Sequence, residues 1–410
     1  MKQKFLYHCN ECGTEYNPRH IQYVCPACTA LNVEKQPPKG VLKTIYDYDK
    51  IAKTKTFQQL KDRQFIDLLP IEDIESLPNL RTGKTPLYEI DQLDGEYLNY
   101  TCYLKDDSQN PTFSFKDRAS AVVSAYAAEN NIDTIVTAST GNAGSSLAGI
   151  CAAQNQKAII MVPATAPLAK LTQIVMYGAT IVPVQGTYDD AFDLSVKATD
   201  QMGWYNRNTA YNPLTIEGKK TVSYELFDQL GDKIPDRVFV PVGDGVIISG
   251  VYKGFEDLLM LGLIEQMPTI VAVQSKGSDN IARNFGKKEF KLKASNTVAD
   301  SISVDIPRNY HMAVDYLKKY NGETLTISDE AILDASKILS KNTGVFAEPA
   351  AATAFGGLLH YQNNNKLNDK SKNVVLLTGS GLKDLKAVQQ IVEIPEAIEP
   401  TIDHLKNLLA

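Results

Sequence analysis

The chain has 410 residues, 43% of them hydrophobic and 22% charged, a composition typical of a globular protein with two or three domains. The formal net charge is −6 and neither sign forms a long run, which argues against a nucleic-acid or anionic-membrane role. No apolar run approaches the length of a membrane span and no apolar segment follows Met1, so we expect a cytoplasmic protein.

Four of the six cysteines lie near the start of the chain. They form two C-x-x-C pairs, each followed by a small residue: Cys9, Cys12, Cys25 and Cys28. Tight turns of this kind aim four thiolates at one metal ion, so the pattern predicts a structural zinc site of the four-cysteine ribbon type. Two disulfides, a rubredoxin-like iron site and a metal-free ribbon remain open as alternatives.

The segment NPTFSFKDRASA, residues 110–121, places a lysine at the start of a predicted helix. Small and apolar residues recur from Ser114 to Asn130, and Lys116 falls in the first turn. The positive end of the helix dipole disfavours an ammonium group there and lowers its pKa. A lysine with a lowered pKa is a nucleophilic amine, as Schiff-base chemistry requires, whereas the competing interpretation is an ordinary solvated lysine. We expect Asp117 and Arg118 to form a cap or a salt bridge.

Three further motifs follow apolar, β-branched runs. ASTGNAGSSLAG, residues 138–149, predicts a strand, a tight turn and a helix start, whose backbone N–H groups converge on an anion site. VFVPVGDGVIISG, residues 238–250, repeats this layout, and its glycine spacing is not that of a dinucleotide-binding fingerprint. NVVLLTGSGLKD, residues 373–384, ends a buried strand on a Thr-Gly-Ser-Gly turn.

Short apolar runs alternate with helical patterns through most of the chain. The predicted strands cover residues 133–139, 157–163, 179–185, 236–243, 269–274 and 373–379. The predicted helices between them include residues 166–178, 188–201 and 221–231. This alternation predicts βαβ units, parallel sheets and an α/β fold. The last segment, 398–410, reads as an amphipathic helix that serves packing or dimerisation.

Taken in order, NPTFSFKDR, ASTGN, AEPAAATAFGG (residues 347–357) and TGSGLKD resemble motifs of fold-type II pyridoxal-phosphate enzymes, the tryptophan-synthase-β type. The resemblance is closest to the threonine synthase family and covers roughly residues 80–390. It implies two parallel-sheet α/β domains with the cofactor in the cleft between them. Some microbial members of the family also carry an N-terminal cysteine ribbon.

The resemblance implies a role for each matching residue. Lys116 matches the lysine that holds pyridoxal phosphate as a Schiff base and later moves the substrate α-proton. Asn142 matches the partner of the cofactor ring hydroxyl, and Thr378 that of the pyridine nitrogen, which favours elimination and replacement over transamination. The cofactor phosphate is assigned to Gly243, Asp244, Gly245, Val246 and Ile247. The substrate carboxylate is assigned to Ser139, Thr140, Asn142 and Ala143.

The resemblance also implies a division of the chain. Residues 1–38 form the zinc-ribbon-like segment, and 39–100 an N-terminal arm that packs on the large domain. Residues 101–212 form a smaller, mobile α/β domain with the substrate loop, and 213–410 the large cofactor-binding domain with a C-terminal helix. The implied reaction converts O-phospho-L-homoserine and water to L-threonine and phosphate through quinonoid and enamine intermediates. A homodimer is the usual state of the family.

Some positions depart from the family pattern. RNTAYNPLTIEGKKT, residues 207–221, aligns with NSxNPxRxEGxKT, a segment that helps to bind the substrate phosphate in the family. Here Ala210 replaces the serine and Thr215 the arginine, and loss of a guanidinium that bonds a dianion is not conservative. Arg207 and Lys84 are the candidates for a replacement cation.

Two loops are closer to those of serine and threonine dehydratases. They are the PVGDGVIISG loop and TVADSISV, residues 297–304. Asp244 would repel a phosphate unless its side chain turns away or bonds backbone amides. Glu348 stands at the start of a predicted helix. It could cap that helix or help to position the cofactor ring, and both roles remain open.

These departures leave more than one hypothesis for the function. A threonine synthase is the first, and a related enzyme that performs β-elimination or β-replacement on serine, threonine, phosphoserine or a similar amino acid is the alternative. A non-catalytic cofactor-binding or partner-binding protein is a third hypothesis.

Overall fold

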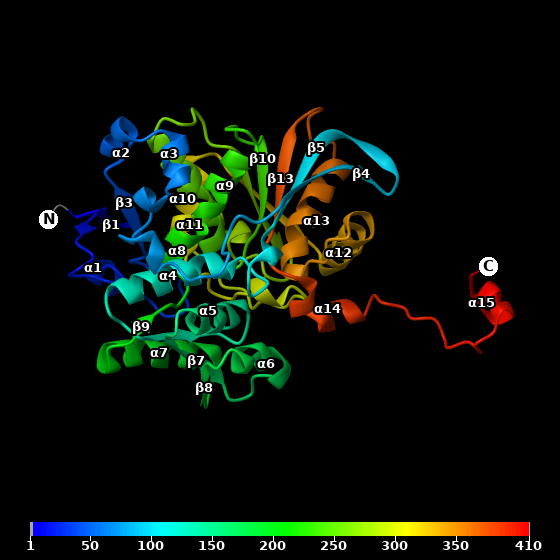
Figure 1. Cartoon of the computed structure of the whole chain (residues 1–410), viewed down its shortest axis with the longest axis horizontal. Coiled ribbons are helices and arrows are strands. Elements are labelled where there is room, and N and C mark those ends of the chain that lie inside the picture. The colour runs from blue at the N-terminus through cyan, green and yellow to red at the C-terminus, as the bar shows by residue number, and fades with distance from the viewer. Residues whose placement is uncertain (1–2, 410) are drawn as a thin grey trace.

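The computed structural model describes residues 3–409, which form three sheets surrounded by helices (Figure 1). The smallest sheet is antiparallel, has the order β2-β1-β3 and lies at the N-terminal end. Its strands are β1 (Phe5–Cys9), β2 (Glu15–Tyr16) and β3 (Leu42–Tyr46). The helices of this region are α1 (Pro26–Thr29), α2 (Tyr48–Thr54) and α3 (Phe57–Asp62).

The four-stranded sheet is entirely parallel, with the order β8-β7-β6-β9. Its strands are β6 (Thr134–Ala138), β7 (Lys157–Pro163), β8 (Thr180–Val184) and β9 (Tyr205–Asn206). Its helices are α4 (Lys116–Glu129), α5 (Asn142–Ala153), α6 (Leu168–Met176) and α7 (Tyr188–Met202). Ile135 packs with Leu147 of α5, whereas Val136 packs with Ala191 of α7, so alternate residues of β6 face two helical layers.

The six-stranded sheet has the order β12-β11-β10-β13-β5-β4 and is parallel except for β4. Its strands are β4 (Leu87–Leu93), β5 (Glu96–Asp106), β10 (Arg237–Pro241), β11 (Thr269–Ser275), β12 (Glu323–Ile327) and β13 (Lys372–Leu377). Its helices are α8 (Leu214–Lys219), α9 (Thr221–Gln229), α10 (Val246–Met260), α11 (Tyr310–Lys319), α12 (Asp329–Thr343) and α13 (Pro349–Asn363). Val238 packs with α9, α10 and α11, and Phe239 packs with α12 and α13, so helices cover both faces of the sheet, as in the predicted α/β fold.

The sheets do not follow two of the expected boundaries. Strand β5 pairs with β13 in the larger sheet, from Thr101 opposite Lys372 to Asp106 opposite Leu377, so a boundary at residue 101 cuts through it. Strand β3 pairs with β1, so the N-terminal sheet continues past residue 38. Strand pairing joins distant parts of the chain, and this explains both differences. The rest of the division, including a mobile smaller domain, stays a prediction.

Helix α8 is held tightly between α4 and α10. A Cβ at Gly218 would overlap the carbonyl oxygen of Arg118 on α4. A Cβ at Gly250 on α10 would lie 2.6 Å from the Cβ of Lys219. Because contacts this close leave no room for a side chain, the two glycines allow the three helices to approach one another.

A buried ionic network lies where α8, α9 and α10 meet. It consists of Glu217, Lys220, Lys253 and Asp257. The Lys220 ammonium lies 2.5 Å from the Glu217 carboxylate and 2.8 Å from that of Asp257, which also pairs with Lys253. The hydroxyl of Tyr224 donates to Asp257 as well. Every ion of this network has a partner of opposite charge, which offsets the cost of its burial.

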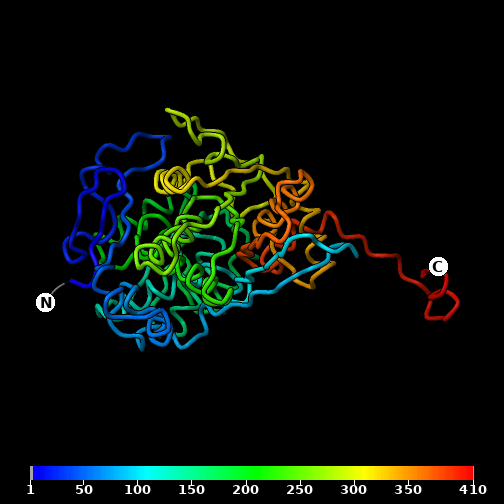
Figure 2. The backbone as a smooth tube through the Cα atoms, turned by 90° about the horizontal axis from the view of Figure 1, so that it is seen from above, coloured from blue at the N-terminus to red at the C-terminus, as the bar shows by residue number. Residues whose placement is uncertain are grey.

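The C-terminal segment leaves the body of the protein. After α14 (Leu385–Gln389) the chain extends away and ends in α15 (Ile402–Leu409), and both views place this helix far from the sheets (Figures 1 and 2). The apolar residues of α15 are all exposed, from 42% for Leu405 to 76% for Leu409. Within residues 3–409, no helix is both long enough and apolar enough to cross a membrane.

Candidate active site

A cavity of about 1130 Å³ brings together most of the predicted site residues. Lys116, the loop 139–143 and the glycine loop 243–247 all line it. Residues 300–306 and helix α7 form another part of its wall, and the N-terminal segment 32–36 reaches its opening. The structure therefore joins, in one cavity, motifs that are more than 120 residues apart in the sequence.

Lys116 is the first residue of α4, as predicted. Its backbone N–H donates to the Ser114 hydroxyl at 3.2 Å, and its side chain lines the cavity. Burial, together with the positive charge of Arg207, lowers the pKa of Lys116 to about 8, although the carboxylates of Glu348 and Asp244 oppose this shift. The amine is thus nucleophilic near neutral pH, mainly because it is removed from water.

The two residues after Lys116 have structural contacts. The Arg118 guanidinium pairs with Asp107 at 2.6 Å and with Glu225 at 2.7 Å. The Asp117 carboxylate accepts the backbone N–H of Thr112 at 2.7 Å. The ion pairs of Arg118 confirm the salt bridge that the sequence analysis gave as one of two expectations, and the Asp117 bond ties the first turn of α4 to the residues before it.

Asn142 begins α5 and contacts the larger sheet's side of the cavity. Its side-chain amide donates to the two carboxylate oxygens of Glu348 at 3.0 and 3.1 Å. Glu348 precedes α13 and is 2% exposed, and burial raises its pKa against the opposing effects of Asn142 and Lys116. The contact fixes the amide of Asn142 and places a carboxylate close enough to Lys116 for their charges to interact.

Thr378 follows β13 and lies next to the turn that carries Lys116. Its carbonyl oxygen accepts the N–H of Phe115 at 2.9 Å. Thr378 is buried, at 5% exposure, and it is not among the residues that line the cavity. The structure therefore places Thr378 beside Lys116 through the backbone, and its predicted contact with a pyridine nitrogen stays a prediction.

The glycine loop has the geometry of a phosphate site. Gly245 adopts a left-handed conformation, with φ of +87°, immediately before α10. The first N–H groups of a helix have no partner inside it and attract anions. Asp244 turns its carboxylate to the backbone N–H of Arg308, at 3.1 Å. The sequence analysis gave such a bond to a backbone amide as one way in which Asp244 avoids repelling a phosphate.

Arg308 joins the two sides of the cavity rim. Its guanidinium lies 4.3 Å from the ring centre of Phe192 and 5.2 Å from that of Tyr188, both on α7. It also pairs with the Asp189 carboxylate at 2.5 Å. Nothing in the sequence motifs pointed to this residue, because its partners lie more than 100 positions away.

The departures from the family pattern are distributed unevenly around the cavity. Ala210 lines it, whereas the hydroxyl of Thr215 donates to the carbonyl oxygen of Asn212 at 2.8 Å. Lys84 is exposed and does not line the cavity. Arg207 is fully buried and donates to the carbonyl oxygen of Lys116 at 3.4 Å, so of the two candidate cations only Arg207 adjoins the site.

Lys219 is a cavity residue that the sequence analysis missed. It is 1% exposed, and its ammonium donates to the carbonyl oxygen of Thr215 at 3.3 Å. Lys219 stands four residues after Thr215, one turn along the same helix face. That spacing is the signal by which the sequence could have revealed it.

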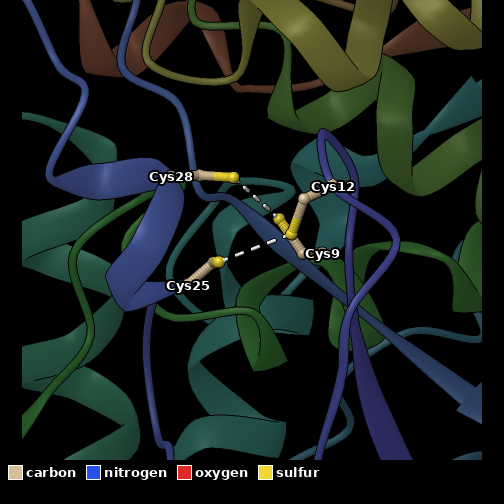
Figure 3. Close-up of side chains that lie close together, drawn as sticks. All are labelled: Cys9, Cys12, Cys25 and Cys28. Atoms are coloured by element: carbon tan, nitrogen blue, oxygen red, sulfur yellow. Dashed lines mark hydrogen bonds between the residues drawn. The ribbon is translucent and has the colours of Figure 1, made fainter.

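The four N-terminal cysteines lie close together (Figure 3). Cys9 and Cys12 come from β1 and the turn that follows it, and Cys25 and Cys28 from the start of α1. The sulfur atoms of Cys9 and Cys28 are 3.7 Å apart and those of Cys12 and Cys25 are 3.8 Å apart. These separations exceed the bond of a disulfide, about 2.05 Å.

Comparison with known proteins identifies the family. The family described as pyridoxal-phosphate dependent enzyme matches residues 79–379. The chain is 33% identical to the threonine synthase of Methanocaldococcus jannaschii, a match that covers 98% of this chain and 99% of the relative. The chain belongs to the threonine synthase family of pyridoxal-phosphate-dependent enzymes. It is accordingly a pyridoxal-phosphate-dependent lyase.

Other members and solved structures agree with this assignment. The threonine synthase of Halalkalibacterium halodurans is 32% identical over 84% of this chain and 97% of its own. Threonine deaminase isoform 2 from Solanum lycopersicum superposes with a TM-score of 0.66 at 22% identity, covering 85% of this chain and 95% of that one. Maize serine racemase gives 0.64 at 22% identity, covering 80% and 94%. These structures establish the fold-type II architecture shared with the threonine synthase family.

Proposed function

We propose that the protein converts O-phospho-L-homoserine and water to L-threonine and phosphate. The observation that carries the proposal is the full-length match to a threonine synthase. The cavity supports it, because a lysine amine with a pKa of about 8 and a glycine turn before a helix N-terminus line the same space. These residues fit the cofactor, which needs an amine for its aldehyde and a cradle for its phosphate.

In this proposal Lys116 and the glycine loop 243–247 hold the cofactor, which when bound supplies the electron sink for carbanion chemistry. The N–H groups of the loop 139–143 bind the substrate carboxylate. The neutral Lys116 amine accepts the proton from the substrate α-carbon, and with a pKa of about 8 about half of the amine is in this neutral form at pH 8. Glu348 holds Asn142 in a fixed orientation, and its charge raises the pKa of Lys116 and so limits the shift that burial causes.

The test is a phosphate-release assay on the purified, pyridoxal-phosphate-loaded protein with O-phosphohomoserine, with identification of the amino-acid product. Phosphate and threonine, both abolished by Lys116→Ala, are the expected result. Lys84→Ala is the matched control, because Lys84 is exposed and does not line the cavity. Turnover of serine, threonine or phosphoserine in place of O-phosphohomoserine would contradict the proposal and favour the alternative enzyme.

We further propose that the four N-terminal thiolates bind a structural zinc ion. Tetrahedral coordination with Zn–S bonds of about 2.3 Å requires sulfur atoms about 3.8 Å apart. The measured separations of 3.7 and 3.8 Å match this spacing. Elemental analysis is expected to find one zinc per chain in the purified protein and none in the Cys9→Ser/Cys12→Ser variant. Cys102→Ser, outside the cluster, is the control, and iron or no metal in the parent protein would contradict the assignment.

A homodimer in the cytoplasm completes the proposal. The apolar residues of α15 are exposed in the single chain, which supports a role in association. Free thiolates that bind a metal persist in a reducing compartment, which supports the cytoplasm. Light scattering on the full chain tests the dimer, and a mass of one chain across the concentration range would contradict it.

A further inference from the structure

The buried basic residues of the protein fall into two groups. Within residues 3–409, six basic side chains are buried: Lys105, Arg118, Arg207, Lys219, Lys220 and Lys253. Four of them pair with carboxylates within 4 Å, in contacts made by Glu217, Glu225, Asp107 and Asp257. Arg207 and Lys219 pair with no carboxylate in the described part of the chain, and their hydrogen bonds go only to hydroxyl and carbonyl oxygens.

The position of these two residues indicates why they are unpaired. Lys219 lines the cavity, and Arg207 lies directly behind Lys116, whose carbonyl oxygen it contacts. Lys219 also packs against Gly250 on α10, the helix whose N-terminus follows the glycine loop. A buried cation without a counter-ion is costly to a fold, and an anionic ligand removes that cost when it binds.

The chemistry of the site defines the anion. Lys219, Lys116 and the residues before the N-terminus of α10 line the cavity, and Arg207 adds positive charge next to Lys116, a combination suited to a dianion. The substrate carboxylate has its own predicted loop at 139–143 on α5. A phosphate monoester is the dianion that remains.

We propose that Lys219, supported by Arg207, binds a phosphate monoester in the cavity. The inference rests on the proposed function, because its two possible sources are the phosphate of the cofactor and that of the substrate. Lys219 extends from the same helix as Thr215 and is one turn further along, so in the case of the substrate phosphate its ammonium supplies the charge that Thr215 lacks.

The protonation of Lys219 provides an independent signature. Burial and the positive charges of Arg207 and Lys116 lower its pKa, and the carboxylate of Asp244 opposes them. A bound dianion raises that pKa again, so binding takes up protons at pH values between the pKa of the free site and that of the occupied site. A purely structural lysine would not produce this uptake.

The experiment uses Lys219→Met and Lys219→Arg, with Lys84→Met as the exposed control. Apoprotein is titrated with pyridoxal phosphate by absorbance, and loaded protein is titrated with inorganic phosphate by calorimetry in buffers of different ionisation enthalpy. Lys219→Met is expected to weaken one of these two affinities about tenfold or more and to abolish its proton uptake. Lys219→Arg retains most of the affinity, because it retains the charge.

The two titrations identify the source of the phosphate. Weakened pyridoxal-phosphate binding assigns Lys219 to the cofactor. Weakened inorganic-phosphate binding, with a matching rise in KM for O-phosphohomoserine, assigns it to the substrate. Both affinities within about twofold of the parent protein would overturn the inference.

Two controls keep this result distinct from folding and from the proposed function. If Lys219→Met does not fold, Lys219→Gln, which keeps a polar head without charge, is judged by the same criteria. Neither titration needs turnover, so a protein that is inactive with O-phosphohomoserine still tests the phosphate site.

Discussion

Two neighbouring lysines, Lys219 at the end of α8 and Lys220 directly after it, differ completely in their surroundings. Lys220 lies in the buried ionic network, within 2.8 Å of two carboxylates. Lys219 lines the cavity and contacts only a carbonyl oxygen. The comparison separates two uses of a buried charge, since the first is balanced by the chain itself and the second awaits a ligand. Charge balance, more than burial alone, distinguishes a structural ion from a binding residue.

The largest loss of stability is expected when the buried ionic network around Lys220 is disrupted. Asp257→Asn removes the carboxylate shared by Lys220 and Lys253, which leaves two buried cations short of a partner. The free energy of unfolding should fall by about 3–5 kcal/mol, measured by urea denaturation. Asp228→Asn, which breaks the more exposed pair with Lys61, should cost about 0–1 kcal/mol. Similar losses of unfolding free energy in both variants would contradict the difference drawn between the buried and the exposed ion pairs.

The adjacent lysines offer a direct test of the comparison. Lys220→Met leaves Glu217 and Asp257 without their shared cation and should destabilise the apoprotein by about 3 kcal/mol. Lys219→Met removes a buried amine that pairs with no carboxylate, so the stability of the apoprotein should stay the same or rise by about 1 kcal/mol. Urea denaturation of the two variants checks this. Equal losses would mean that Lys219 has a structural role.

The reactivity of Lys116 should depend on pH around its lowered pKa. Only the neutral amine reacts, so labelling of the apoprotein with an amine reagent should become about tenfold slower for each pH unit below the pKa. Mass spectrometry of the peptide that contains Lys116 should place the midpoint at about 8. A midpoint near 10.5, the value of an unperturbed lysine, would show that the cavity does not shift this group.

The smallest effect concerns the carboxylate beside Lys116. Glu348 raises the pKa of Lys116, so Glu348→Gln should move the labelling midpoint to lower pH by about 0.5 to 1 unit. Glu323→Gln, on β12 and outside the cavity lining, is the control and should leave the midpoint in place. A rise of the midpoint would contradict the charge assignment of Glu348.

The sequence predicted the parallel strands well and the antiparallel ones poorly. Runs such as residues 237–241 and 372–377 are buried on both faces and therefore appear as continuous apolar segments. Strand β5 starts with two exposed residues, and β4 is exposed along most of its length, so neither stands out from a polar loop. Strand β5 joins the larger sheet by pairing with β13, and β4 joins it by pairing with β5, and no local pattern reveals either partner.

The candidate site shows the same limit. Motifs with several fixed residues located Lys116 and the two glycine loops. Lys219 and Arg308 belong to no motif that the sequence analysis recognised as a site. Their neighbours in the cavity come from segments that only the fold brings together. Spacing on one helix could have paired Lys219 with Thr215, but the lack of an ion pair at its ammonium, within the described residues, is a property of the packed structure.

The close approach of α4 and α8 at Gly218 sets the distance between Lys116 and the proposed phosphate site at Lys219. Lys116 stands at the start of α4 and Lys219 at the end of α8, and no side chain separates the two helices where they touch. The gap between the reacting amine and the proposed phosphate site is thus determined by backbone contact. In the proposed function, this distance limits how many carbon atoms can lie between the α-carbon and the phosphate of a substrate. A residue larger than glycine at position 218 would push α4 and α8 apart, increase the distance between the two sites and change which substrate fits.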